Sequence, residues 1–131
     1  MDIKDFFREP TKLTKVVVSD RFKDKDGNKI PFEIMPIDEN KNEQIKLQCE
    51  RISGNEKVFD DNLYITKLVC ECVVSPDLDS SELQTNYNVL GREKLIKSML
   101  YAGEFSNLVK YVEEICGFNS DILEDIKKIK N

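Results

Sequence analysis

Apolar residues recur at helical spacing through most of the chain after Asp38, and this periodicity restricts the chain to a mainly helical fold. The clearest stretch follows Asp60 and Asp61, two residues of a type that commonly caps helix N-termini. Its apolar side chains lie three and four residues apart, as one face of a helix requires: Tyr64, Ile65, Leu68, Val69, Cys72 and Val73. Because residues 69–74 are rich in β-branched side chains, a strand is also open for the second half of this element.

The N-terminal part of the chain has the pattern of a β-hairpin. Residues 16–22 are rich in β-branched side chains, and residues 30–37 alternate between apolar and polar positions. The polar segment between them has Asp-Gly at its centre, which is typical of a turn. The two prolines of the return strand lack an N–H donor, so this strand should lie at a sheet edge or end early. We therefore expect an arm over residues 1–13 and a β-hairpin over residues 14–37.

Capping and turn residues divide the rest of the chain into helices. Asp38 can cap the first helix, which we expect to run to about Ile52 and to stop at Ser53-Gly54-Asn55. The second helix, described above, ends at Ser75-Pro76-Asp77. The segment Asp79-Ser80-Ser81-Glu82 has the form of a capping box and predicts a short third helix.

A longer helical element opens at Gly91-Arg92. We expect it to break at Gly103, to continue from Glu104 to Cys116, and to end in a left-handed conformation at Gly117. Asn119-Ser120-Asp121 can then cap a last helix. The predicted fold class is α+β and mainly helical. An N-terminal β-hairpin precedes a compact region of about five helices over residues 38–131, all within a single domain over residues 1–131.

Composition excludes several classes of function. The net charge is −5, and the basic residues are interleaved with acidic ones, so the chain has no evident attraction for nucleic acid. The N-terminus lacks the apolar run of a signal peptide, and no segment approaches the roughly 18 apolar residues of a membrane span. We therefore expect a cytoplasmic protein that binds neither nucleic acid nor a membrane.

The chain offers little that could perform catalysis. It contains no histidine, which removes the usual general base, the usual metal ligand and every Ser-His or Cys-His pair. Its five glycines form no phosphate-binding loop of a common type. The four cysteines have neither disulfide density nor metal-ligand spacing, so we interpret them as reduced, mostly buried side chains. We expect no catalytic residue, no metal and no cofactor.

The apolar residues near the C-terminal end are candidates for binding a partner. The stripe is wide, and its members cannot all point inward from one thin helix. One interpretation is that the stripe is simply core, and the other is that part of it binds a partner helix. The candidate partner-binding residues are Tyr101, Gly103, Glu104, Phe105, Leu108, Tyr111 and Val112.

Several short motifs occur in a fixed order. Thr11-Lys12-Leu13 lies near the start, and Ser75-Pro76-Asp77-Leu78 precedes the short third helix. Residues 99–108 follow with the sequence Met-Leu-Tyr-Ala-Gly-Glu-Phe-Ser-Asn-Leu, and Gly117-Phe118 closes the series. In order, spacing and total length the chain resembles the XkdN-like family of phage tail assembly chaperones. Members occur in contractile-tailed phages, defective prophages and phage-tail-like bacteriocins of Gram-positive bacteria.

The resemblance implies a function that composition and spacing do not. Such chaperones bind the long tape measure protein, keep it soluble and help bring tail tube subunits onto it. They act in the cytoplasm of the bacterial host and are generally absent from the mature particle. The implied partners are therefore the tape measure protein and the tail tube protein, with self-association left open.

Two other functions remain open at this point. The chain could be a structural subunit retained in a phage tail or tail-like particle. It could also be a cytoplasmic adaptor unrelated to phage.

Overall fold

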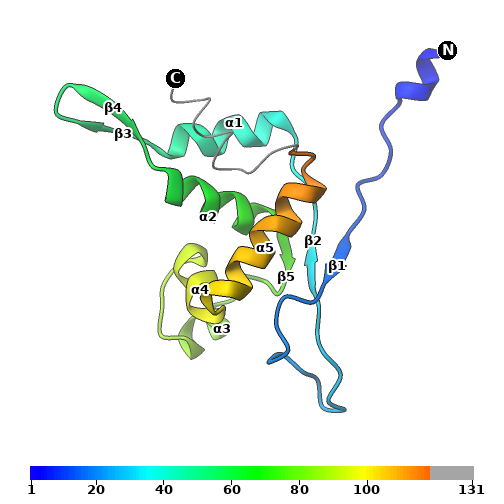
Figure 1. Ribbon diagram of the computed structural model, residues 1–131, viewed down its shortest axis with the longest axis vertical. Helices are drawn as coiled ribbons and strands as arrows, with labels where there is room; N and C mark the ends of the chain where they lie inside the picture. The colour runs from blue at the N-terminus through cyan, green and yellow to red at the C-terminus, as the bar shows by residue number, and fades with distance from the viewer. Residues whose placement is uncertain (119–131) are drawn as a thin grey trace.

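The computed structural model describes residues 1–118, in which a small antiparallel sheet packs beside a group of helices (Figure 1). The predicted helix after Asn119 lies outside the described residues. The elements, in chain order, are the 3-10 helix η1 (Ile3–Phe6), β1 (Thr14–Val16), β2 (Phe32–Ile34), α1 (Glu39–Gln48), β3 (Glu50–Ser53), β4 (Glu56–Phe59), α2 (Asp61–Cys72), β5 (Val73–Ser75), α3 (Ser81–Asn86), α4 (Arg92–Met99) and α5 (Ala102–Ile115). The α+β, mainly helical class with an N-terminal hairpin is confirmed.

The N-terminal hairpin forms the first two strands of a three-stranded antiparallel sheet with the order β1-β2-β5. Val16 pairs with Phe32, and Ile34 pairs with Thr14 on one side and Val73 on the other. The side chains of Val16, Phe32 and Ile34 are buried, since alternate positions of a strand face the helices. The paired strands are shorter than predicted, because the chain leaves regular pairing after Val16.

The predicted turn lies at the tip of this hairpin. Lys23 and Lys29 form an isolated bridge, and the Oδ1 of Asp24 accepts the N–H groups of Asp26 and Asn28, each at 2.9 Å. Gly27 has φ +81°, a left-handed conformation that glycine adopts without strain. The turn chemistry predicted from Asp-Gly is therefore present.

The structure corrects the predicted extent of the first helix. Helix α1 ends at Gln48, and the strands β3 and β4 form a second antiparallel hairpin, whereas the sequence pattern predicts helix to about Ile52 and a stop at Ser53-Gly54-Asn55. Ser53 pairs with Glu56 around the two-residue turn Gly54-Asn55, in which Gly54 has φ +65°. A Gly-Asn pair between two short alternating segments is a hairpin signal, which the helical interpretation of residues 39–52 overlooked.

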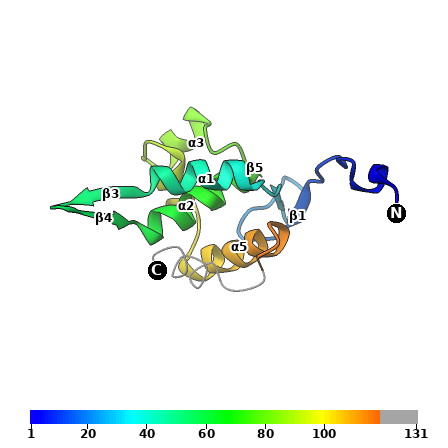
Figure 2. The ribbon, with the colours of Figure 1, turned by 90° about the horizontal axis from the view of Figure 1, so that it is seen from above.

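Helix α2 lies at the centre of the fold and packs against α1, α4 and α5 (Figure 1, Figure 2). Its N-cap is Asp60, whose Oδ1 accepts the N–H of Leu63 at 3.1 Å. The strand that the sequence left open is present at its end, since the chain passes from Cys72 directly into β5. The core contains Leu68 and Val69 of this helix, with Leu95 and Ile96 of α4 and Leu108 and Val112 of α5, all 0% exposed.

Two parts of the molecule extend away from this core. The β3–β4 hairpin projects on one side, and the N-terminal arm projects on the other (Figure 1, Figure 2). Among residues 1–118, no helix is long and apolar enough to cross a membrane.

Candidate partner-binding site

The junction between α4 and α5 carries most of the predicted partner-binding residues. Leu100 and Tyr101 are extended, so the break lies at these two residues and helix α5 begins at Ala102. Gly103 therefore lies in the first turn of α5, which corrects the prediction of a break at Gly103. No left-handed glycine is needed here, because the extended backbone of Leu100 and Tyr101 already turns the chain.

Glu104 joins the N-terminal hairpin to the start of α5. Its Oε1 accepts the backbone N–H of Tyr101 at 2.8 Å, in the manner of a capping box, and a hydrogen bond from Nη2 of Arg21 at 2.5 Å. The same Nη2 of Arg21 donates to the carbonyl oxygen of Met99 at 2.8 Å. Arg21 thus holds both sides of the α4–α5 junction from a segment about 80 residues earlier in the chain.

These contacts hold Glu104 in its ionised form. The guanidinium of Arg21 makes the largest contribution, followed by the hydroxyl of Ser19 and the N–H of Tyr101, and together they lower the pKa of Glu104 to about 2. The same ion pair raises the pKa of Arg21 above its ordinary value. The pair is therefore fully charged throughout the physiological pH range.

Tyr101 and Arg21 form an exposed stacked pair. The guanidinium carbon of Arg21 lies 4.0 Å from the centroid of the Tyr101 ring, and 5.0 Å from that of Phe22. Tyr101 remains 67% exposed even so. Tyrosine and arginine are the side chains most enriched at the energetic centres of protein interfaces, and stacking lowers the entropy that each would lose on binding.

The remaining candidates divide between core and surface. Leu108 and Val112 are 0% exposed and Phe105 is partly buried against the core, so these three side chains belong to the inner face of α5. Gly103 is exposed, and Tyr111 is 36% exposed. The apolar stripe is thus mostly core, and the surface of α5 is left to Gly103, Tyr111 and the polar residues between them.

The structure brings together Tyr101, Gly103 and Glu104 at one end of α5. Tyr111 lies about 15 Å further along, at 1.5 Å per helical residue, and is not part of this group. Sequence reasoning missed Arg21 and Ser19. No local pattern could have identified them, because their partners are 78 to 85 positions away along the chain.

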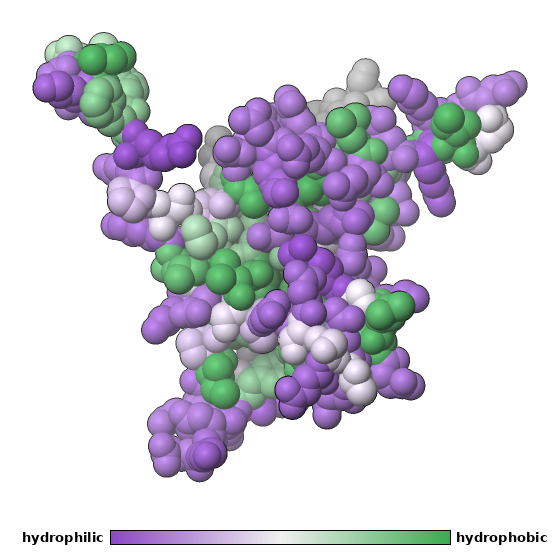
Figure 3. Space-filling model, turned by 180° about the vertical axis from the view of Figure 1, so that it is seen from behind, coloured by the Kyte–Doolittle hydropathy of each residue, from purple (hydrophilic) through white to green (hydrophobic). Residues whose placement is uncertain are grey.

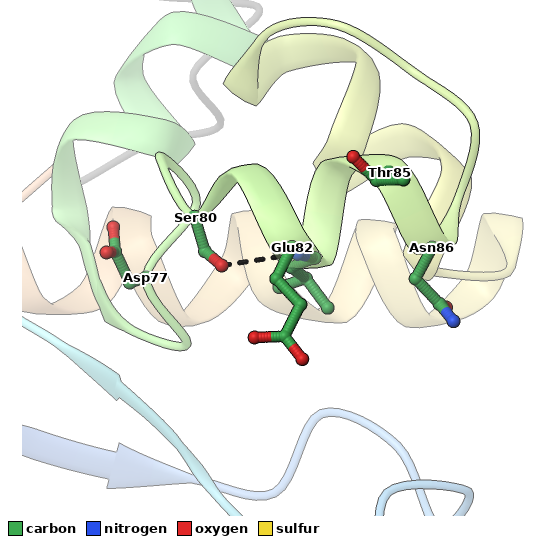
Figure 4. Close-up of a pocket in the computed structure, with 6 residues that line it drawn as sticks. Asp77, Ser80, Glu82, Thr85 and Asn86 are labelled. Atoms are coloured by element: carbon green, nitrogen blue, oxygen red, sulfur yellow. Dashed lines mark hydrogen bonds between the residues drawn. The ribbon is translucent and has the colours of Figure 1, made fainter.

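A shallow hollow of about 670 Å³ lies along α3 (Figure 4). Its lining residues are Asp77, Ser80, Glu82, Leu83, Thr85 and Asn86. The hydroxyl of Ser80 accepts the N–H of Leu83 at 3.2 Å and so acts as a helix cap. Within residues 1–118, no group of three His, Cys, Asp or Glu side chains is placed to hold a metal ion. The side chains that line the hollow are two carboxylates, two hydroxyls, one amide and the apolar Leu83.

The four cysteines are free thiols, three of them buried and Cys116 partly exposed. Burial raises the pKa of Cys49 to about 11 and that of Cys70 to about 12. Cys72 and Cys116 are neighbours, with 3.7 Å between their sulfur atoms. The hydrogen bond between them raises the pKa of Cys72 and lowers that of Cys116.

Comparison with known proteins places this chain in a family. The profile of the family described as Phage XkdN-like tail assembly chaperone protein matches residues 3–130. The chain belongs to this family of phage tail assembly chaperones. It is 32% identical over 120 residues to the Phage-like element PBSX protein XkdN of Bacillus subtilis (strain 168), across 87% of this chain and 80% of the relative.

A second relative of this chaperone has a known structure. YqbN of Bacillus subtilis (strain 168), an uncharacterized protein, is 30% identical over 120 residues, with the same shares of the two chains covered. A crystal structure of YqbN superposes with a TM-score of 0.78, covering 91% of this chain and 98% of the other, at 24% sequence identity. The chaperone therefore shares the fold of YqbN.

Membership of the family makes the chain a protein of phage tail assembly, with phage tail proteins as its partners. The family is one of assembly chaperones and not of enzymes. Residues 99–108, one of the motifs that carry the resemblance, form the end of α4 and the first half of α5 in this chaperone. The exposed Arg21–Tyr101 pair lies at this junction.

Proposed function

We propose that this chaperone binds the tape measure protein, keeps it soluble and helps to recruit tail tube subunits during tail assembly. The observation that carries the proposal is the exposed Arg21–Tyr101 pair, held by Glu104 within the segment that carries the family motif. A tape measure protein exposes long apolar helical faces before the tube encloses it. A small domain with a rigid aromatic surface can cover such a face reversibly.

The proposed binding face has its centre at Tyr101 and Gly103, where α5 begins, and Tyr111 extends it about 15 Å further along the helix. Gly103 has no neighbouring atoms within 4 Å of the position that a Cβ would take, so a partner helix can approach the backbone closely there. Glu104 acts by positioning Arg21 and the start of α5. Phe105, Leu108 and Val112 act from the inner side of the helix, by fixing its orientation against α2.

Weak individual contacts suit this function. A contact through one exposed tyrosine stacked on an arginine gives modest affinity, but a long tape offers many equivalent sites along its length. Each bound chaperone can then be displaced as the tube polymerises. We propose accordingly that the chaperone is non-catalytic, acts in the cytoplasm of a Gram-positive host and is absent from the mature contractile tail or tail-like particle.

The test is co-expression with the tape measure protein of the same phage or prophage. We expect the tape to be insoluble or degraded when expressed alone and soluble when expressed with the tagged chaperone, which should recover it in a pull-down. Tyr101→Ala should reduce the recovery at least about tenfold. Leu90→Ala is the matched control, since Leu90 is 86% exposed but lies outside α5.

Mass spectrometry of finished particles separates this function from a structural one. Absence of the chaperone from purified tails supports the proposal. Abundant chaperone in mature tails would instead identify it as a retained structural subunit, and failure to recover the tape at all would refute tape measure binding.

A further inference from the structure

Two of the four cysteines, Cys72 and Cys116, meet across the fold. Their sulfur atoms lie 3.7 Å apart, although 44 positions of the chain separate the two residues. Cys72 is the last residue of α2, and Cys116 is the C-cap of α5. The thiol of Cys70, two positions earlier in α2, points elsewhere and donates to the carbonyl oxygen of Arg92. The structure therefore brings Cys72 and Cys116 within reach of a covalent bond.

The pair needs little movement to close this bond. An S–S bond is about 2.0 Å long, so each sulfur would move by roughly 0.8 Å. The backbone of Cys72 is held, because its carbonyl oxygen accepts the N–H of Met35 at 2.8 Å. Cys116 lies where α5 ends, and Gly117 after it has φ +78°. The movement can therefore fall on the last turn of α5, since helix ends fray more easily than helix centres.

Solvent reaches the two sulfur atoms unequally. Cys72 is 0% exposed and belongs to the core, whereas Cys116 is partly exposed. Helix α5 lies on the opposite side of the molecule from the mainly hydrophilic face that Figure 3 shows (Figure 2). A small oxidant in solution therefore meets Cys116 first, at the end of α5.

The contacts around the pair give the two thiols different roles. The hydrogen bond with Cys72 makes the largest contribution to lowering the pKa of Cys116, and the backbone N–H of Ile37 adds to it, against the effect of burial. The same hydrogen bond and burial raise the pKa of Cys72, so this thiol keeps its proton. Because the thiolate is the nucleophile, Cys116 is the residue that attacks an oxidant, and Cys72 is the thiol placed to react with the product.

We propose that Cys72 and Cys116 are a redox modification site, which a hydroperoxide converts to an intramolecular disulfide between the ends of α2 and α5. The sulfur of Cys116 attacks an oxygen of the hydroperoxide. An S–O bond forms, the O–O bond breaks, and the leaving alcohol or water takes the proton of the first thiol. The sulfur of Cys72 then attacks that of Cys116, so that the S–S bond forms, the S–O bond breaks and hydroxide leaves with the second thiol proton as water. The two thiols lose two electrons, which the hydroperoxide gains.

Such a disulfide is a transient state in a reducing cytoplasm, where cellular thiols return it to the dithiol. The buried partner limits damage, because Cys72 captures the sulfenic acid before more oxidant converts it irreversibly to the sulfinic acid. While it lasts, the bond closes residues 72–116 into a covalent loop that contains β5, α3, α4 and α5. The inference goes beyond the proposed function, and its test uses this chain alone.

Hydrogen peroxide treatment of the full-length chain tests the site. We expect non-reducing peptide mapping to give a linked Cys72–Cys116 peptide, while the denatured, unreduced protein keeps the single-chain mass of 15.2 kDa. The melting temperature should rise by about 10 °C, because a covalent loop of this length restricts the unfolded chain. Dithiothreitol should reverse both changes.

Three variants separate the roles, each compared with its own reduced form. Cys116→Ser should give neither the linked peptide nor the rise in melting temperature. Cys70→Ala is the matched control and should retain both, since Cys70 is a buried thiol of the same helix outside the pair. Cys72→Ala should stop at the sulfenic acid of Cys116, which dimedone labels.

A wild-type chain that yields no linked peptide would overturn the proposal, whether Cys116 stays reduced or is oxidised to the sulfinic acid. A linked peptide that contains Cys49 or Cys70, or a bond between two chains, would overturn it as well. So would a linked form that melts no higher than the reduced chain, because the bond would then not constrain the fold.

Discussion

Replacement of Leu108 and of Tyr101 by alanine should have different effects on folding and on binding, although Leu108 lies in α5 and Tyr101 directly precedes this helix. Leu108 is 0% exposed and packs in the core. Leu108→Ala removes the equivalent of about three methylene groups, at about 0.8 kcal/mol each, and leaves a cavity, so the total loss should be about 3 kcal/mol within a range of 2–5 kcal/mol. For a chain of this length, that corresponds to a fall in melting temperature of about 10 °C.

Tyr101→Ala should leave folding nearly unchanged. The ring is 67% exposed, so its loss creates no cavity, and the backbone N–H that Glu104 accepts is retained. Only the stack with Arg21 disappears, which is worth about 0.5–1 kcal/mol at an exposed position. The melting temperature should therefore fall by no more than about 4 °C, while recovery of the tape measure protein falls at least about tenfold.

Thermal unfolding followed by circular dichroism, together with a pull-down of each folded variant, measures both effects. Tyr101→Phe is the matched control, since it retains the ring over Arg21 and should behave as wild type in both assays. The reasoning fails if Tyr101→Ala destabilises the chain as much as Leu108→Ala does, because the tyrosine would then be part of the core. It fails equally if Leu108→Ala melts with the wild type, because α5 would then not pack on α2 by this face.

Three further outcomes are expected. The pKa of Glu104 in the folded chain is about 2 against an ordinary 4.5, so its contribution to stability is complete above about pH 4.5 and is lost as the pH falls towards 2. Glu104→Gln should therefore have a lower melting temperature than the wild type at pH 7, and this difference should shrink at low pH. A difference that stays constant across this pH range would contradict the ion pair. A short Gly-Ser insertion after Asp26 should leave soluble expression and melting unchanged, because it lengthens an exposed turn, and loss of the fold would show that the tip contacts the core. Iodoacetamide at neutral pH should alkylate Cys116 before Cys49 or Cys70, because the pKa of Cys116 is lowered whereas burial raises the pKa values of the other two. Peptide mapping measures this order, and modification of Cys70 first would refute it.

Most helix starts were determined locally and could be predicted from the sequence. Asp38, Asp60 and Ser80 each cap the helix that follows, with side-chain oxygens that accept N–H groups at 3.0–3.2 Å. The predicted capping box over Asp79-Ser80-Ser81-Glu82 is corrected by one residue, because Ser80 is the cap and accepts the N–H of Leu83. The tip of the N-terminal hairpin was equally local, because Asp24, Gly27 and Asn28 supply their own turn bonds. The order of short motifs also identified the family, since order and spacing are properties of the chain itself.

The tertiary structure decided between conformations that the local sequence pattern allows equally. The sequence of residues 50–59 is compatible with a helix end and a loop, or with two strands around a Gly-Asn turn. The two strands form, and Ile52 is 77% exposed, whereas a helix over this segment would have placed it in the core. The periodicity predicts that Tyr101, Leu108 and Val112 belong to one apolar stripe. Only the packing against α2 decides that Leu108 and Val112 are buried and that Tyr101 is exposed. The binding face depends on Arg21 meeting Glu104 across 83 residues, and no local preference encodes such a contact, because it exists only once the hairpin and α5 lie side by side.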